Sequence, residues 1–357
     1  MNKSYLKIFK NKKIIITGHT GFKGSWLSLW LYLNGAKILG ISDSLITKPS
    51  HFKLLNLQKK IISKNLDIND LKKLKRVFQT FKPDFVFHLA AQSIVKRSYL
   101  NPVKTWKTNL LGTLNVLECL RLQKKETIAI MITSDKAYKN IETKKGYIEK
   151  DSLGGSDPYG ASKSSADICI NSYIKSFFSG KKNKVYVTTA RAGNVIGGGD
   201  WTEDRLIPDI IKSSNLNNPV LIRNLFATRP WQHVLDVLNG YLIASYKLKK
   251  NKRLHGQAFN FGPSSKKDIT VKEVLSISKK LWPKIKWKFN KNKKNYIENT
   301  LLKLNSTKSK SILGWRSILT FKQTINLTIN WYKKYYLKEK NVFKLSSNQI
   351  KNFERNI

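Results

Sequence analysis

The chain has 357 residues, of which 41% are hydrophobic and 25% charged. These values suit an ordinary globular protein with one large or two ordinary domains. Its formal net charge of +45, from 67 Lys and Arg against 22 Asp and Glu, first suggests a nucleic-acid binder. Because the lysines are spread over the whole length among many Asn and Ile, we instead expect a general attraction for anionic ligands, with no nucleic acid as primary ligand.

Apolar runs, cysteines and histidines narrow the class of protein further. No apolar run approaches the ~18 residues of a membrane span, and Ile14-Ile15-Ile16 is too short for a signal-peptide core, so no membrane association is expected. Cys119 and Cys169 stand alone within helical patterns, which is typical of core positions in a reduced, cytoplasmic protein. The five histidines show no ligand spacing, and the sequence therefore predicts no metal site.

Hydrophobic patterns predict strands alternating with helices over the first half of the chain. Strands are expected at 13–17, 37–42, 84–89, 127–133 and 184–190, and helices at 24–34, 72–80, 103–123 and 158–178. This alternation predicts an α/β fold with a Rossmann-type, doubly wound parallel sheet.

After Gly193 the sequence pattern changes and predicts loops, short helices and proline-containing turns, with many aromatic residues. We therefore expect the sheet domain over 11–190 and a smaller mixed α/β substrate domain over 191–337, from which the chain can cross back to the first domain. Residues 338–357 are polar and are expected to form a poorly anchored tail.

A glycine-rich turn follows the first predicted strand and opens the first predicted helix. Gly18, Gly21 and Gly24 permit a tight turn and close approach of a ligand, and backbone amides at a helix start suit a pyrophosphate. In this context the GxxGxxG spacing predicts a dinucleotide site. Asp43 ends the second strand, where a carboxylate binds a ribose diol and favours NAD over NADP; a turn-forming Asp is an equal alternative. Asp67 follows a further predicted strand and is expected beside the adenine of the dinucleotide; a position facing solvent is a nearly equal alternative.

Two short stretches carry the candidate chemistry. Tyr159 and Lys163 are four residues apart on one predicted helix, and a cation beside a phenol lowers its pKa, so Tyr159 is a candidate base for a hydroxyl proton. Ser134, at the end of a strand, adds a hydroxyl. Alcohol oxidation does not need the neighbouring Asp135 and Lys136, so this acid and this amine indicate a second reaction.

In its glycine-rich turn and its Tyr159 and Lys163 pair, the chain resembles the extended short-chain dehydrogenases/reductases. Longer strings narrow the resemblance to the CDP-glucose 4,6-dehydratases of bacterial surface-sugar (O-antigen, lipopolysaccharide) synthesis. It covers about residues 11–335 and rests on the strings at 18–27, 87–92, 133–136, 191–201, 204–209, 229–234 and 313–315. What the resemblance implies is oxidation of C4 of CDP-glucose by bound NAD, loss of water across C5 and C6, and hydride return to C6.

The resemblance also implies roles for the candidate residues. Tyr159 would be the C4 base, held near its anionic form by Lys163, and Ser134 would hydrogen-bond the C4 oxygen. Asp135 would protonate the leaving C6 hydroxyl. Lys136 stands where commoner relatives carry a glutamate base for the C5 proton and where the CDP-specific branch carries lysine; it is a base or an electrostatic partner. Further cofactor contacts are expected at Thr20, Phe22, Leu89, Ala90, Ala91 and Thr133, together with Lys163.

Candidate substrate contacts lie mostly in the second half of the chain. Arg205 and Arg229 fall in the family-like strings, and their guanidinium forks match the oxygens of a diphosphate. Asn194 is a candidate donor to the same group, and Arg223 is a weaker one. Arg97 is expected near the sugar, at even odds with a surface position.

Two further expectations concern competing functions and assembly. Another NDP-sugar dehydratase, acting on dTDP-glucose or GDP-mannose, or an epimerase or reductase, remains the alternative; an epimerase has no leaving hydroxyl to protonate. In this family the helices equivalent to 103–123 and 158–178 pair across a two-fold axis, so a homodimer is expected.

Overall fold

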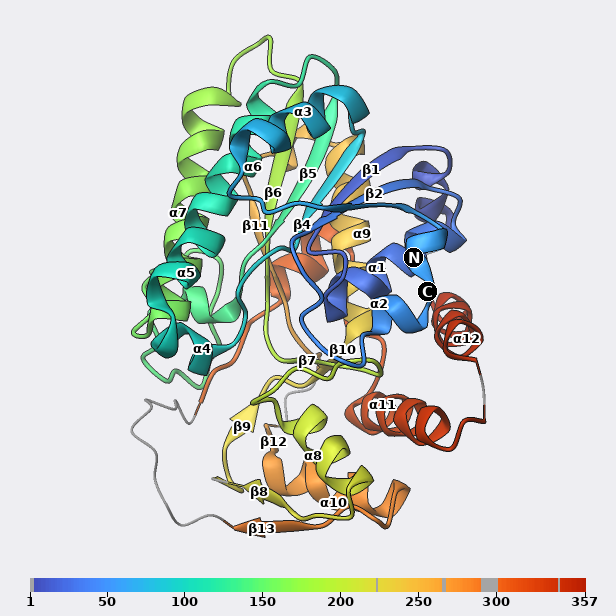
Figure 1. Cartoon of the computed structure of the whole chain (residues 1–357). Helices are drawn as coiled ribbons and strands as arrows, with labels where there is room; N and C mark the ends of the chain where they lie inside the picture. The colour runs from blue at the N-terminus through green and yellow to red at the C-terminus, as the bar shows by residue number, and fades with distance from the viewer. Residues whose placement is uncertain (1–2, 223, 265–267, 290–300, 340) are drawn as a thin grey trace.

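The computed structural model describes residues 3–222, 224–264, 268–289, 301–339 and 341–357. Its centre is a parallel sheet of seven strands in the order β11-β6-β5-β4-β1-β2-β3 (Figure 1). The strands are β1 (Lys13–Thr17), β2 (Lys37–Ser42), β3 (Ile62–Asn65), β4 (Phe85–His88), β5 (Thr127–Ile132), β6 (Val185–Ala192) and β11 (Ala258–Phe261). The order reverses between β1 and β4, the position where doubly wound sheets bind ligands. The predicted fold class is confirmed.

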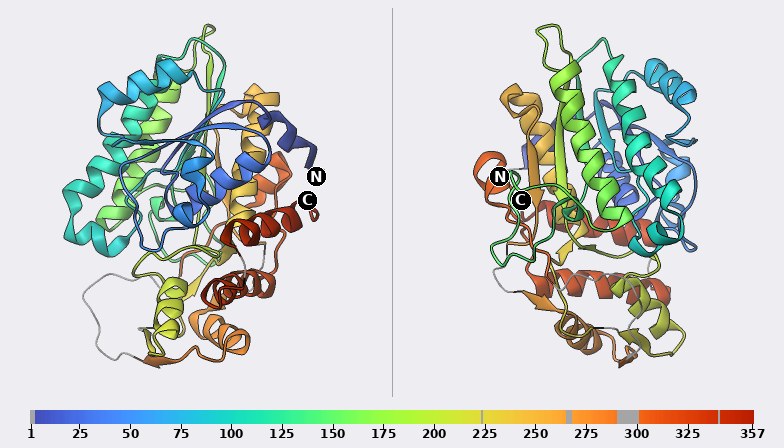
Figure 2. Two further views of the ribbon diagram at one scale, coloured as in Figure 1. Left: turned by 45° about the vertical axis from the view of Figure 1, so that its right-hand side comes forward. Right: turned by 90° about the vertical axis from the view of Figure 1, so that its left-hand side faces the viewer.

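Helices cover both faces of this sheet (Figure 2). One face packs against α3 (Leu71–Phe81), α6 (Gly112–Arg121) and α7 (Pro158–Phe177), and the other against α1 (Phe22–Leu33) and α9 (Val234–Lys250). Because both faces are covered, every residue of β5 is buried. The helix predicted at 103–123 is built from α5 (Pro102–Trp106), a π-helical turn at Lys107–Leu111, and α6.

A smaller region lies beyond the carboxyl ends of the strands (Figure 1). It contains α8 (Leu206–Asn215), α10 (Val271–Leu281), and the paired short strands β7 (Val195–Ile196) with β10 (Gln232–His233), β8 (Val220–Ile222) with β13 (Trp287–Phe289), and β9 (Thr228–Arg229) with β12 (Ile269–Thr270). Between these segments the chain returns to the sheet through α9 and β11. Shorter elements are α2 (His51–Leu54), α4 (Val95–Leu100), 3-10 turns at Lys3–Phe9, Leu57–Lys59, Asp135–Ala137 and Lys252–Leu254, and a π turn at Ser309–Leu313.

The carboxyl-terminal segment differs from the expected poorly anchored tail at 338–357. After α11 (Phe321–Tyr336), α12 (Val342–Glu354) packs on α1. Ile350 is fully buried, and the ring of Phe353 meets the edge of Trp30 in α1. The few apolar residues of this polar segment fall on one helical face, so the helix is anchored although its overall composition is polar.

Within the described part of the chain, no helix combines the length and the hydropathy that a bilayer span requires.

Candidate active site

A cavity of about 500 Å³ opens at the carboxyl ends of the central strands. Its walls come from the glycine-rich turn after β1, the segments after β2, β3, β4 and β5, the start of α7, and the region from 192 to 231. The sheet and the smaller region therefore contribute to one site.

Only glycine fits at positions 18 and 24 of the turn that follows β1. Gly18 has a φ of +72°, and a Cβ on it would lie 2.8 Å from the backbone nitrogen of Ala90. A Cβ on Gly24 would lie 2.1 Å from the carbonyl oxygen of Gly18. The turn opens α1 at Gly21, which gives the helix no side-chain cap, and this cradle fits a dinucleotide pyrophosphate at the helix start. Asp43, directly after β2, lines the same cavity and fits a ribose diol.

The cavity brings together most residues that the sequence singled out. Two lie elsewhere: the Thr20 hydroxyl donates to the carbonyl of Ser44 at 2.7 Å, and Arg97 pairs with Glu203 at 3.5 Å. Arg223 lies outside the described residues. The predicted residues that line the cavity are Gly18, Gly21, Phe22, Gly24, Asp43, Asp67, Leu89, Ala90, Ala91, Thr133, Ser134, Asp135, Lys136, Tyr159, Lys163, Asn194, Arg205 and Arg229.

Asp135 sits in the 3-10 turn after β5 and is 4% exposed. Its Oδ1 accepts the Ser134 hydroxyl at 3.0 Å and the Lys136 backbone N–H at 2.9 Å. Its Oδ2 is buried and has no hydrogen-bond partner in the described structure. Burial raises the pKa of Asp135, although Ser134 and Lys136 act in the opposite direction. A carboxyl group with a raised pKa and one unpaired oxygen at a cavity is suited to general-acid chemistry.

Tyr159 departs from the expectation of a lowered pKa. Burial raises the pKa of its phenol to about 12, and the hydrogen bond with Ser134 only partly opposes that shift. The Lys163 ammonium donates to the carbonyl of Ile132 at 3.0 Å. Burial, together with the nearby Lys23, lowers the pKa of Lys163 to about 7. The expectation considered the neighbouring cation and left out the cost of burying a phenolate.

Two positive groups, Arg205 and Lys23, line the cavity. Arg205 donates to Asp200 at 3.1 Å and to Ser93 at 2.9 Å, which fixes its guanidinium at the cavity wall. Lys23, which the sequence analysis did not select, also lines the cavity, and burial beside Arg205 lowers its pKa to about 8. Cations gathered in a partly buried cavity favour an anionic ligand.

A buried ion pair connects the ends of two central strands to α7. Arg191 donates to both carboxylate oxygens of Asp167 at 2.8 Å, and both side chains are 5% exposed. Thr133 donates to the same carboxylate at 2.9 Å. The network joins β5, β6 and α7, and so holds the segments that carry Ser134, Tyr159 and Lys163.

Three residues of the site region were not predicted from the sequence, namely Lys23, Asp157 and Asp167. Lys23 lies inside the glycine-rich string, where the spacing points to backbone contacts with a phosphate and gives no signal for the lysine side chain. Asp157 stands directly before Pro158, a pattern typical of a helix start, and it does cap α7. Asp167 carried no local signal, because its partner Arg191 comes from a distant strand.

A glycine cradle at the reversal of strand order, next to a Ser-Tyr-Lys constellation, defines the class of extended short-chain dehydrogenases/reductases. Within that class, residues 15–328 match the family model described as GDP-mannose 4,6 dehydratase, and the chain belongs to this family.

Individual relatives agree with that assignment. The chain is 39% identical to a CDP-glucose 4,6-dehydratase of Salmonella typhimurium strain LT2 over 91% of each chain. The epimerase Mth375 of Methanothermobacter thermautotrophicus superposes with a TM-score of 0.81 at 23% identity, covering 94% of this chain and 96% of that one. The dTDP-glucose 4,6-dehydratase of Bacillus anthracis in complex with NAD gives 0.75 at 20% identity, covering 92% and 99%. The two structures support the fold.

Proposed function

We propose that this protein catalyses the NAD-dependent 4,6-dehydration of a nucleotide hexose, converting CDP-glucose to CDP-4-dehydro-6-deoxyglucose and water. The observation that carries the proposal is the position of Asp135 and Lys136 in the same cavity as Ser134, Tyr159 and Lys163. The identity to the Salmonella relative supports CDP-glucose as the substrate.

The glycine cradle, Asp43 and Lys163 would hold NAD. Bound NAD would supply the hydride acceptor for C4 and the hydride donor for C6, and its positive charge would favour the phenolate of Tyr159. The cradle excludes any side chain at Gly18 and Gly24, which supports close approach of a phosphate to the backbone.

At C4, Tyr159 takes the hydroxyl proton while Ser134 holds the oxygen. Because burial raises the pKa of Tyr159 to about 12, this phenol depends on added positive charge in the site to act as a base. The Lys163 side chain, anchored on Ile132, is placed to contribute to that charge when protonated.

At C5 and C6, Asp135 protonates the leaving hydroxyl while Lys136 acts at the C5 position. The 4-ketone acidifies the C5 proton, so removal of that proton and departure of water complete the elimination. Lys136 takes the proton or stabilises the enolate as an ammonium; a Lys136→Met variant that exchanges C5 at the wild-type rate would exclude both roles. Arg205, Arg229 and Asn194 also line this cavity and would bind the diphosphate.

The test is incubation with CDP-glucose and NAD in deuterated water, followed by NMR of the sugar. A 6-deoxy-4-keto product with solvent deuterium at C5 supports the proposal. dTDP-glucose and GDP-mannose, assayed in parallel, test the choice of nucleotide. A C4-epimerised product that retains its C6 hydroxyl would support the alternative, an epimerase, and contradict the proposal.

We also propose that the protein is a cytoplasmic homodimer. Four apolar side chains on the neighbouring segments α5, Lys107–Leu111 and α7 are exposed, namely Val103 (66%), Leu111 (46%), Ile168 (56%) and Phe177 (52%). Covering them with a second copy would remove this apolar surface from water. Free Cys119 and Cys169 suit a reducing compartment. A role in O-antigen synthesis stays a prediction from the resemblance.

A further inference from the structure

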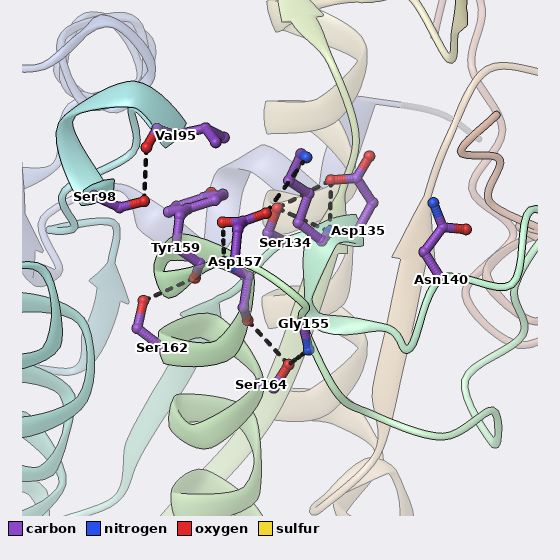
Figure 3. Close-up of polar contacts among 12 residues, drawn as sticks. Val95, Ser98, Ser134, Asp135, Asn140, Gly155, Asp157, Tyr159, Ser162 and Ser164 are labelled. Carbon is purple, nitrogen blue, oxygen red and sulfur yellow. Dashed lines mark hydrogen bonds and ion pairs between the residues drawn. The ribbon is translucent and has the colours of Figure 1, made fainter. Parts of the chain in front are cut away.

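The two carboxylate oxygens of Asp157 contact different groups, the start of α7 and the side chain of Lys136. Oδ1 accepts the backbone N–H of Gly160 at 2.9 Å and so caps the first turn of α7. Oδ2 lies 3.9 Å from Nζ of Lys136. Figure 3 shows Asp157 close to Ser134, Asp135 and Tyr159, whereas Asn140 stands apart. The Asp157 side chain is 7% exposed and is therefore shielded from solvent.

The cap fixes the start of the helix that carries Tyr159. An Asp at this position satisfies an amide that the helix itself leaves unpaired and aligns a negative charge with the helix dipole. The first turn, and with it the direction of the Tyr159 side chain, is therefore set by the same carboxylate that faces Lys136.

The ion pair limits the freedom of a long side chain. The backbone N–H of Lys136 is already held by Ser134 at 3.2 Å and Asp135 at 2.9 Å, but those contacts leave its four-carbon stem free to rotate. Asp157 supplies an opposite charge near Nζ where the lysine is 27% exposed, a setting in which such a pair is screened less than at the open surface.

We infer that Asp157 is a positioning residue that aligns Lys136, the group acting at C5, with Tyr159, the group acting at C4. The inference rests on the proposed function. One rigid carboxylate sets the distance between the two groups, so the ketone formed at C4 lies within reach of Lys136 without a rearrangement of the site.

The test separates the two steps with variants that keep the helix cap. Asn and Ser both cap helices well, but neither presents a negative charge to Lys136. In Asp157→Asn and Asp157→Ser we expect C4 oxidation, followed as transient reduced nicotinamide, to stay within about twofold, and C5 exchange with deuterated water to fall about tenfold. In a Lys136→Met background, Asp157→Asn should change C5 exchange by less than about twofold, because the two residues act as a unit.

Asp70 offers a matched control, since it caps α3 and pairs with Lys73 at 2.9 Å away from the cavity. Asp70→Asn should leave both steps unchanged. Wild-type C5 exchange in both Asp157 variants, equal losses at C4 and C5, or a further loss in the Lys136→Met background would each overturn the inference. Failure of wild-type protein to oxidise C4 would instead overturn the proposed function, and wild-type exchange in Lys136→Met would overturn the role of Lys136 and the inference with it.

Discussion

Replacing Asp135 by Asn should leave C4 oxidation intact and block the elimination of water across C5 and C6. The substitution keeps the shape of the side chain, and its remaining oxygen can still accept from the Ser134 hydroxyl and from the Lys136 N–H. What it removes is the acidic proton. Among the described residues the Oδ2 of this carboxyl is buried without a hydrogen-bond partner, and burial raises its pKa. The amide cannot protonate the leaving C6 hydroxyl.

The size of the effect follows from the role. A positioned general acid contributes ~10²–10⁴-fold, so elimination should slow by that factor, equivalent to about 3–5 kcal/mol at 1.36 kcal/mol per tenfold. C4 oxidation should change by no more than about threefold, because the Ser134 and Tyr159 side chains stay in place. The free energy of unfolding should change by less than about 1 kcal/mol, since no cavity is created and both hydrogen bonds to Oδ1 remain.

Single-turnover mixing with CDP-glucose provides the assay. The variant should form reduced nicotinamide at the normal rate and then accumulate it with the 4-keto sugar, detected by NMR after quenching. In the wild type, elimination should decline as pH rises through the raised pKa of Asp135, because the protonated acid is lost, and this decline should be absent from Asp135→Asn. Normal product formation by the variant, or an equal loss of C4 oxidation, would refute the assigned role.

Two further predictions concern stability and space in the site. Burial raises the pKa of Asp236 to about 7 even though it accepts the Ile318 N–H, so the native state holds a proton that the unfolded state has released. The contribution is fully present below the unfolded pKa of ~4 and is lost as pH rises through about 7, at up to ~1.4 kcal/mol per pH unit. Urea unfolding across this window should show a shallower pH dependence for Asp236→Asn than for wild type; equal slopes would contradict the assignment. A Cβ on Gly193 would lie 2.7 Å from Cγ of Pro230 and 3.0 Å from Oδ2 of Asp135. Gly193→Ala should therefore displace that carboxyl and slow elimination more than C4 oxidation in the same single-turnover assay, whereas equal slowing of both steps would indicate a general packing defect.

Much of the fold and part of the site could be predicted because their signals are local. The Gly18, Gly21 and Gly24 spacing needs only the neighbouring strand and helix to define a phosphate cradle, and the structure places all three on the cavity. Tyr159 and Lys163 share a helix face because of the helical repeat. The prediction of a poorly anchored tail at 338–357 is wrong. The segment is polar on average, but its apolar residues lie on one face of α12, and this face packs on α1.

Local sequence patterns were enough to predict the alternation of strands and helices, the glycine cradle, and the reactive groups that follow β5 and begin α7. These features depend on backbone preferences and on residues a few positions apart. Tertiary structure alone decided the electrostatics. Burial raises the pKa of Tyr159, whereas the sequence predicted a lowered one. Arg97 forms an ion pair with Glu203 at the surface instead of lining the cavity. Asp157 forms an ion pair with Lys136 because α7 begins beside the turn after β5. Desolvation and charge pairing depend on residues that are distant in sequence and close in the folded chain, so a local sequence pattern does not predict them.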